Sequence, residues 1–137
     1  MKKHFLALLT VVCFLLPLQI LAQQATPPEG EQRALEKAQQ IHRELLRGAN
    51  FAEMARKYSD DPGSREKGGE LGYIEQGWLE PAYEEAALRL SEGEFTEPVK
   101  TEFGYHIIQL IGIREGEFNT RHILIKPEKA GAAGDQE

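Results

Sequence analysis

Residues 105–113 read Tyr-His-Ile-Ile-Gln-Leu-Ile-Gly-Ile, and this run is the strongest strand signal in the 137-residue chain. A second, shorter apolar run, Arg-His-Ile-Leu-Ile, occupies residues 121–125. Residues 114–119 between the two runs are typical of a hairpin loop. Each run carries a histidine at its second position, and side chains alternate between the two faces of a strand. His106 and His122 are therefore predicted to lie on the same face of a sheet.

The register of this hairpin depends on where the chain turns. Direct opposition of His106 and His122 requires paired residue numbers that sum to 228, which centres the loop on Arg114. A turn tip at Glu115-Gly116 gives a sum of 231 and offsets the histidines by about three residues. Glycine tolerates a positive φ, so the tip at Gly116 is favoured. We expect either an offset histidine pair or a loop widened by a bulge.

The rest of the chain alternates helical and extended patterns. Apolar residues at helical spacing predict three helices, over residues 31–47, 51–58 and 80–90. Two more extended segments are predicted, at residues 70–74 and 95–99. This order indicates an α+β domain in which a small antiparallel sheet of about four strands packs with three to four helices.

The first 22 residues have the organisation of a secretory signal: two lysines, an apolar run, and a small residue, Ala22, at the exit. The apolar run is shorter than the roughly 20 residues of a membrane span, although an uncleaved anchor is the alternative. The predicted division is a signal peptide (1–22), a flexible leader (23–30), one domain (31–127) and a flexible tail (128–137). The only cysteine, Cys13, falls in the signal, so the processed chain is expected to lack disulfides and thiolate metal sites.

Composition and motifs exclude several functions. A net charge of −6 provides no basic surface for nucleic acid. The two strand histidines have no further ligands at zinc spacing, and a pair of core histidines is the structural alternative for them. Ser59, Asp60 and Asp61 are typical turn-forming residues. The G-x-S-x-G nucleophile elbow is missing, and the glycine-rich stretch at 68–72 lacks the lysine of a phosphate-binding loop.

Six blocks between Gly48 and Ile108 occur together in one order and spacing. They are Gly48–Ala55, Tyr58–Ser64, Lys67–Tyr73, Pro81–Ala87, Glu97–Thr101 and Phe103–Ile108. In this combination the chain closely resembles the parvulin family of peptidyl-prolyl cis–trans isomerases. The resemblance covers more than half of the chain that would remain after signal cleavage. It implies the parvulin-like version of the α+β fold.

The resemblance also implies a site. The implied catalytic residues are Asp61, His106 and His122. The implied substrate-binding residues, which form an apolar proline pocket, are Leu71, Leu79, Tyr83 and Phe103. No cofactor and no metal is implied. Leu79 and Tyr83 stand where the family usually has methionine and phenylalanine, and Trp78 replaces a glutamine, so the pocket is expected to differ in shape from that of other members.

A larger departure concerns the order of the strands. The family begins with a strand of the R/S-H-I-L type before its first helix, and residues 23–33 contain no such strand. The motif occurs instead near the other end, at residues 120–127, with His122 as its histidine. The chain therefore resembles a circularly permuted parvulin. The alternative is that His122 opens a second, incomplete domain of a tandem array, which would leave the first domain short of a strand.

The resemblance implies an isomerase that assists the folding of exported proteins, with the periplasm as the expected compartment. Its implied partners are proline-containing unfolded or partly folded polypeptides, with no nucleic acid and no stable membrane span after signal cleavage. A non-catalytic chaperone or interaction module that binds unfolded exported polypeptides is the alternative function. A structural fragment of a tandem protein is the third possibility.

Overall fold

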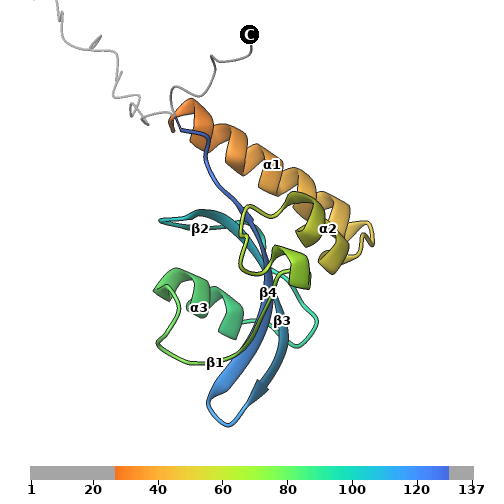
Figure 1. Ribbon diagram of the computed structural model, residues 1–137, viewed down its shortest axis with the longest axis vertical. Coiled ribbons are helices and arrows are strands. Elements are labelled where there is room, and N and C mark those ends of the chain that lie inside the picture. The colour runs from red at the N-terminus through yellow and green to blue at the C-terminus, as the bar shows by residue number, and fades with distance from the viewer. Residues whose placement is uncertain (1–26, 130–137) are drawn as a thin grey trace, which may run out of the picture.

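The computed structural model describes residues 27–129, and within this range helices pack on a small sheet to form an α+β domain (Figure 1). The helices are α1 (Glu29–Leu46), α2 (Phe51–Tyr58), α3 (Pro81–Leu88) and the short 3-10 helix η1 (Arg65–Lys67). The strands are β1 (Glu70–Glu75), β2 (Val99–Thr101), β3 (Gly104–Arg114) and β4 (Glu117–Ile125). The predicted fold class is confirmed. The predicted signal peptide, residues 23–26 of the leader and residues 130–137 of the tail lie outside the described residues.

The helix boundaries follow from the residues at each end. α1 begins at Glu29, two residues before the predicted start, because a proline at the helix entrance removes only an N–H that the first turn leaves unused. It ends ahead of Gly48, whose φ of 98° is accessible to glycine. The side chain of Asn50 accepts a hydrogen bond from the backbone N–H of Glu53 and starts α2 at the predicted residue.

Two predicted elements have different bounds in the structure. α3 is shorter than residues 80–90, because Glu80 lies before the helix and caps it by accepting the N–H groups of Ala82 and Tyr83. The segment 95–99 is not a strand of its own: Phe95 makes only an isolated bridge, and regular pairing starts in β2.

The four strands are antiparallel in the order β1-β4-β3-β2. The last strand in the sequence, β4, therefore lies between β1 and β3 rather than at an edge (Figure 1). Arg114 of β3 pairs with Glu117 of β4 across a two-residue turn at Glu115 and Gly116, both of which have positive φ. The prediction of a loop over residues 114–119 is wrong, because the two strands continue up to the two residues of the turn.

A bulge between Leu110 and Gly112 sets the register of the upper part of this hairpin. Between the turn and the bulge the paired numbers sum to 231, as in the pair Arg114–Glu117. Beyond the bulge they sum to 230, so that His106 faces Leu124. The prediction of a turn tip at residues 115–116 with an offset histidine pair is confirmed, and the bulge reduces the offset from three residues to two.

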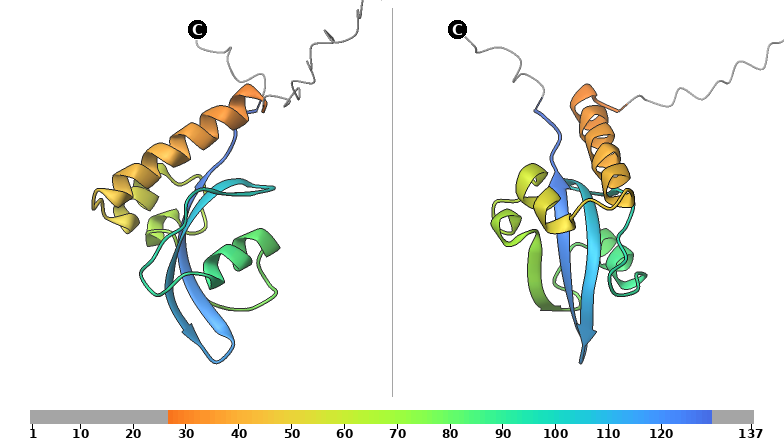
Figure 2. Two further views of the ribbon diagram at one scale, coloured as in Figure 1. Left: turned by 180° about the vertical axis from the view of Figure 1, so that it is seen from behind. Right: turned by 90° about the vertical axis from the view of Figure 1, so that its right-hand side faces the viewer.

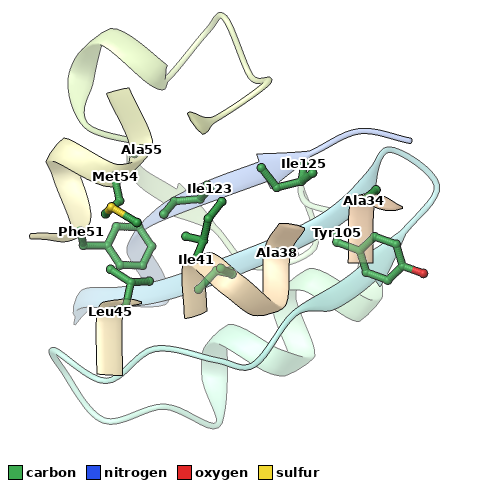
Figure 3. Close-up of a cluster of buried hydrophobic side chains, with 11 residues drawn as sticks. Ala34, Ala38, Ile41, Leu45, Phe51, Met54, Ala55, Tyr105, Ile123 and Ile125 are labelled. Atoms are coloured by element: carbon green, nitrogen blue, oxygen red, sulfur yellow. The ribbon is translucent and has the colours of Figure 1, made fainter. Parts of the chain in front are cut away.

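The two faces of the sheet carry separate apolar clusters. On one face, side chains of α1 and α2 pack against alternate residues of β3 and β4 (Figure 3). Ala38, Ile107 and Ile123 in this cluster are fully buried. On the other face, α3 packs against the intervening residues of the same strands, including Ile108 and Phe118. Because β3 and β4 are buried on both faces, the backbone that carries the two histidines is held from both sides.

The start of α1 and the segment that follows β4 lie beside one another (Figure 2). The approach is so close that a Cβ atom on Gly30 would lie 2.3 Å from the carbonyl oxygen of Glu128. The carboxylate of Glu128 also pairs with Arg33 on the first turns of α1. Within residues 27–129, no helix has both the length and the apolar composition that crossing a membrane would require.

Candidate functional site

Two buried histidines on the α3 face of the sheet form the centre of the site. The Nδ1 atoms of His106 and His122 lie 3.1 Å apart. Their rings are nearly parallel, with an interplanar angle of 20° and centroids 5.3 Å apart. The prediction that both rings share a face is confirmed. The two-residue offset makes them diagonal neighbours on adjacent strands, and this arrangement allows the rings to stack.

The loop after α2 brings a carboxylate to this pair. One oxygen of Asp61 lies 2.8 Å from Nε2 of His122, and the hydroxyl of Ser64 donates to the same oxygen. The loop is fastened to the central strand, because the backbone N–H of Leu124 donates to the hydroxyl oxygen of Ser59. Asp61 also accepts the N–H of Gly63. The turn-forming interpretation of Ser59 and Asp61 is therefore correct, and Asp61 additionally reaches a buried histidine.

The hydrogen bonds fix the direction of the protons along this chain of side chains. Ionised Asp61 can only accept, so His122 donates to it through Nε2–H and, when neutral, accepts at Nδ1. His106 must then donate through Nδ1–H and accept at Nε2, where the hydroxyl of Thr101 lies 2.7 Å away. The Thr101 oxygen in turn accepts the backbone N–H of Phe103. Every donor in the series points toward Asp61.

The burial of these groups keeps both histidines neutral at pH 7. Desolvation, reinforced by the neighbouring His122, lowers the pKa of His106 from 6.5 to about 4. Desolvation also lowers the pKa of His122, although Asp61 opposes that shift. Burial by itself would raise the pKa of Asp61, but hydrogen bonds from Ser64 and His122 outweigh it, and its pKa lies below the usual value. The site therefore combines neutral imidazoles with one ionised carboxylate.

Tyr83 of α3 lies beneath both imidazole rings. Its ring meets His106 and His122 edge-on, at centroid distances of 5.3 and 5.7 Å. Its hydroxyl lies 2.9 Å from the hydroxyl of Thr120 on β4, so that both buried polar groups are paired. Burial raises the pKa of the Tyr83 hydroxyl, which therefore stays protonated. The ring can offer an apolar surface to a ligand while its polar end is satisfied inside the domain.

A pocket of about 360 Å³ opens above these residues. It collects all seven residues that the resemblance assigned to a site: Asp61, Leu71, Leu79, Tyr83, Phe103, His106 and His122. Four residues that were not predicted also line it: Glu80, Thr101, Leu124 and Lys126. Most of its exposed lining is apolar, and the side chain of Phe103 stands at the rim with 54% of its surface exposed.

Two polar residues of this site, Ser64 and Thr101, were not predicted from the sequence. Ser64 was not identified as a candidate, because nothing in its local sequence separates a turn serine from one that donates to Asp61. Thr101 fell outside the extended segment predicted at 95–99, whereas the structure has it on β2, next to the strand of His106. With the correct bounds for β2, Thr101 would have been a diagonal cross-strand neighbour of that histidine, two residues from its direct partner Val99. Within residues 27–129 no cluster of three or more His, Cys, Asp or Glu side chains could hold a metal ion.

The comparisons with known proteins place the chain in a family. The family model described as the PPIC-type PPIASE domain, Rotamase, matches residues 19–112, and the chain belongs to this family of parvulin-type domains. The match stops before β4, which supplies the second histidine of the pair. The resemblance to parvulins deduced from the six sequence blocks is confirmed.

Similar proteins carry this domain within longer chains. The chain is 47% identical over 78 residues to the foldase protein PrsA 1 of Bacillus cereus, a stretch that is 57% of this chain and 27% of the relative. It is 43% identical over 84 residues to the chaperone SurA of Chromohalobacter salexigens, covering 61% of this chain and 19% of that one. A crystal structure of PrsA from Bacillus anthracis matches with a TM-score of 0.58 and 42% identity over 59% of this chain and 37% of that chain. The matched stretch of the present chain thus covers about a fifth to just over a third of the length of these relatives.

Proposed function

We propose that this chain is a peptidyl-prolyl cis–trans isomerase that assists the folding of exported proteins. The observation that carries the proposal is the apolar pocket with the Asp61–His122–His106 chain along one wall. Rotation about an X–Pro bond makes and breaks no covalent bond, so the reaction requires neither nucleophile nor cofactor. The protein has only to bind the twisted imide more tightly than either planar isomer.

The apolar residues would hold the proline ring. Tyr83 forms the floor of the pocket, since only 4% of its surface is exposed, and Leu71 and Leu79 pack beside it. Phe103 at the rim would cover the ring once it is bound. Removing water from around the imide favours rotation, because the planar form has the larger charge separation and loses more solvation.

The polar chain would act on the carbonyl group of the residue before proline. Twisting the imide interrupts resonance, so the carbonyl oxygen loses part of its negative charge. A carboxylate close to that oxygen repels the planar form more than the twisted form, and the difference lowers the barrier. Asp61 can play this role because its side chain remains 24% exposed while hydrogen bonds keep it ionised. His122 and His106 would hold it in place.

We further propose that the domain is circularly permuted relative to its family. The position of β4 in the interior of the sheet supports this, as does the end of the family match at residue 112. The close approach of Gly30 to Glu128 supplies the other support, because a linker across that gap would restore the order strand, then first helix. In this proposal residues 31–127 form one complete domain, preceded by a cleaved signal peptide (1–22) and a leader (23–30) and followed by a tail (128–137). The proposed location is outside the cytoplasm, in the periplasm.

A chaperone or interaction module without isomerase activity is the second candidate. Two exposed aromatic side chains favour it, Trp78 with 76% and Phe103 with 54% of their surfaces exposed, because such rings bind unfolded segments without needing a proline. The discriminating experiment measures isomerisation of a proline tetrapeptide and suppression of aggregation with the same preparation. Isomerase activity supports the first function, and activity only in the aggregation assay supports the second.

A further inference from the structure

A single buried carboxylate accepts the side-chain hydrogen bonds that hold the loop between β1 and α3. Glu84, on the first turn of α3, has 9% of its surface exposed. Its two oxygens accept the backbone N–H of Gly77 at 2.8 and 2.9 Å, and one of them also accepts the N–H of Leu79 at 3.1 Å. Charge-assisted hydrogen bonds of this kind are stronger and shorter than neutral ones. One side chain therefore ties two loop positions to the helix.

The loop that Glu84 holds is the one that supplies a wall of the pocket. Leu79 lines the cavity, and its backbone N–H is one of the two bound by the carboxylate. Gly77 has a φ of 93°, a conformation that glycine adopts at little cost. Trp78, between the two tethered residues, is largely exposed and makes little contact that could hold the loop. The carboxylate is the principal side-chain tether of this segment.

The charge of Glu84 is not explained by an ion pair. Among the described residues, no Lys, Arg or His nitrogen lies within 4.0 Å of its carboxylate. Its neighbour Glu85 is exposed and pairs with Arg89 on the surface of the same helix. Burying an unpaired carboxylate is costly unless hydrogen bonds replace its water, and here the loop N–H groups do so. The buried position of Glu84 is therefore explained by its hydrogen bonds to the loop and not by an ion pair at the surface.

We propose that Glu84 is a positioning residue that sets the apolar grip of the pocket through Leu79. The expected change in KM rests on the proposed isomerase function. The expected gain in mobility of the loop does not. Glu84 makes no hydrogen bond to Asp61, His122 or His106, so its loss should loosen substrate binding and leave the polar chain intact.

The first experiment compares Glu84→Ala and Glu84→Gln with the matched surface control Glu85→Ala. The alanine variant should raise KM for a proline tetrapeptide about ten-fold with kcat within about two-fold, because ground-state and transition-state grip are lost together. Glu84→Gln keeps one acceptor oxygen and should show a smaller rise, and Glu85→Ala should show none. If Glu84→Ala fails to fold, the comparison between Glu84→Gln and the control decides. A Glu84→Gln variant with the KM of the control would overturn the proposal.

The second experiment reads the loop itself and does not depend on isomerase activity. Trp78 is the only tryptophan of the chain, so its fluorescence anisotropy reports the mobility of this loop alone. Loss of the tether should lower the anisotropy while the far-UV circular dichroism stays unchanged. Unchanged anisotropy in Glu84→Ala would contradict the positioning role even if activity fell. Lowered anisotropy in a protein that isomerises no peptide would support the tether and contradict the proposed function.

The third experiment tests whether Glu84 acts through Leu79. In a double-mutant cycle, Glu84→Ala should have a large effect on KM in the parent and little further effect in a Leu79→Ala background. Fully additive effects would mean that Glu84 influences binding by another route, and the proposal would fail. The ¹H–¹⁵N signals of the two imidazoles serve as the structural control, because they should not move in any of these variants.

Discussion

The Nδ1 atoms of His106 and His122 are hydrogen-bonded at 3.1 Å although neither residue lies directly opposite the other in the sheet. The turn at Glu115-Gly116 sets an offset of three residues, and the bulge between Leu110 and Gly112 reduces it to two, which brings both histidines to the same face. Between two neutral imidazoles that share one hydrogen bond, either ring can be the donor. The ionised Asp61 selects one of them, because it requires a donor on Nε2 of His122.

Stability should fall as the pH is lowered from 7 toward 4. The pKa of His106 is about 4 in the folded protein against 6.5 when exposed, so the unfolded chain binds more protons throughout this window. Each such proton contributes a slope of at most about 1.4 kcal/mol per pH unit. Thermal unfolding at a series of pH values between 4 and 7.5 measures this dependence of stability on pH. The variant His106→Gln should have a shallower slope, and an identical slope would contradict the assignment of a buried neutral imidazole.

The floor of the pocket depends on the ring of Tyr83 more than on its hydroxyl. Tyr83→Ala should lower kcat/KM for a proline tetrapeptide by about ten-fold or more, because the wall that excludes water is lost. Tyr83→Phe keeps the ring and leaves the buried hydroxyl of Thr120 without its partner, at a cost of about 1–3 kcal/mol in stability. The Tyr83→Phe variant should retain most of the isomerase activity. Full activity in a folded Tyr83→Ala variant would remove this residue from the site.

The carboxylate of Asp61 should matter for kcat and for the titration of His122. Asp61→Asn removes the negative charge next to the substrate carbonyl and should reduce kcat by about ten-fold or more. Because Asp61 raises the pKa of His122 against desolvation, the substitution should lower that pKa further. NMR titration of the imidazole signals measures the shift. The adjacent variant Asp60→Asn is the control, and an unmoved His122 signal in Asp61→Asn would contradict the contact.

Deletion of residues 119–137 should unfold the domain. It removes most of β4, an interior strand that pairs with both β1 and β3, and with it His122. Deletion of residues 130–137 alone leaves β4 and Glu128 in place and is the control. Circular dichroism and the isomerase assay measure the outcome. A shortened protein that folds and isomerises at the full rate would show that β4 belongs to another domain, against the permuted arrangement.

The exported protein should begin at Gln23. Lys2 and Lys3, the apolar run that follows and Ala22 have the order of a cleavable signal. N-terminal sequencing of protein recovered from outside the cytoplasm measures the cleavage site. Retention of Met1 on membrane-bound material would instead support an uncleaved anchor.

Much of the domain could be predicted from local sequence. The period of the apolar residues located α1, α2 and β3, because burial of one face imposes the same spacing wherever the helix or strand packs. Element ends were less predictable. Glu80 was assigned to α3 and in fact caps it, and the extended segment at 95–99 was displaced from β2, because capping and edge pairing depend on partners distant in sequence.

What the sequence determined by itself is the antiparallel hairpin of β3 and β4. The shared face of His106 and His122 depends in addition on the bulge between Leu110 and Gly112, because an offset of three residues would place the two side chains on opposite faces and the bulge makes it two. The turn at Glu115-Gly116 also follows locally, from the positive φ that glycine accepts.

Only the tertiary structure decided that the two rings touch, that Asp61 meets His122 across 61 positions, and that Glu84 ties the loop of Leu79 to α3. The physical reason is that a bulge, a buried carboxylate and an interior position for the last strand are each selected by the packing of the whole domain. No local period or propensity encodes these distances.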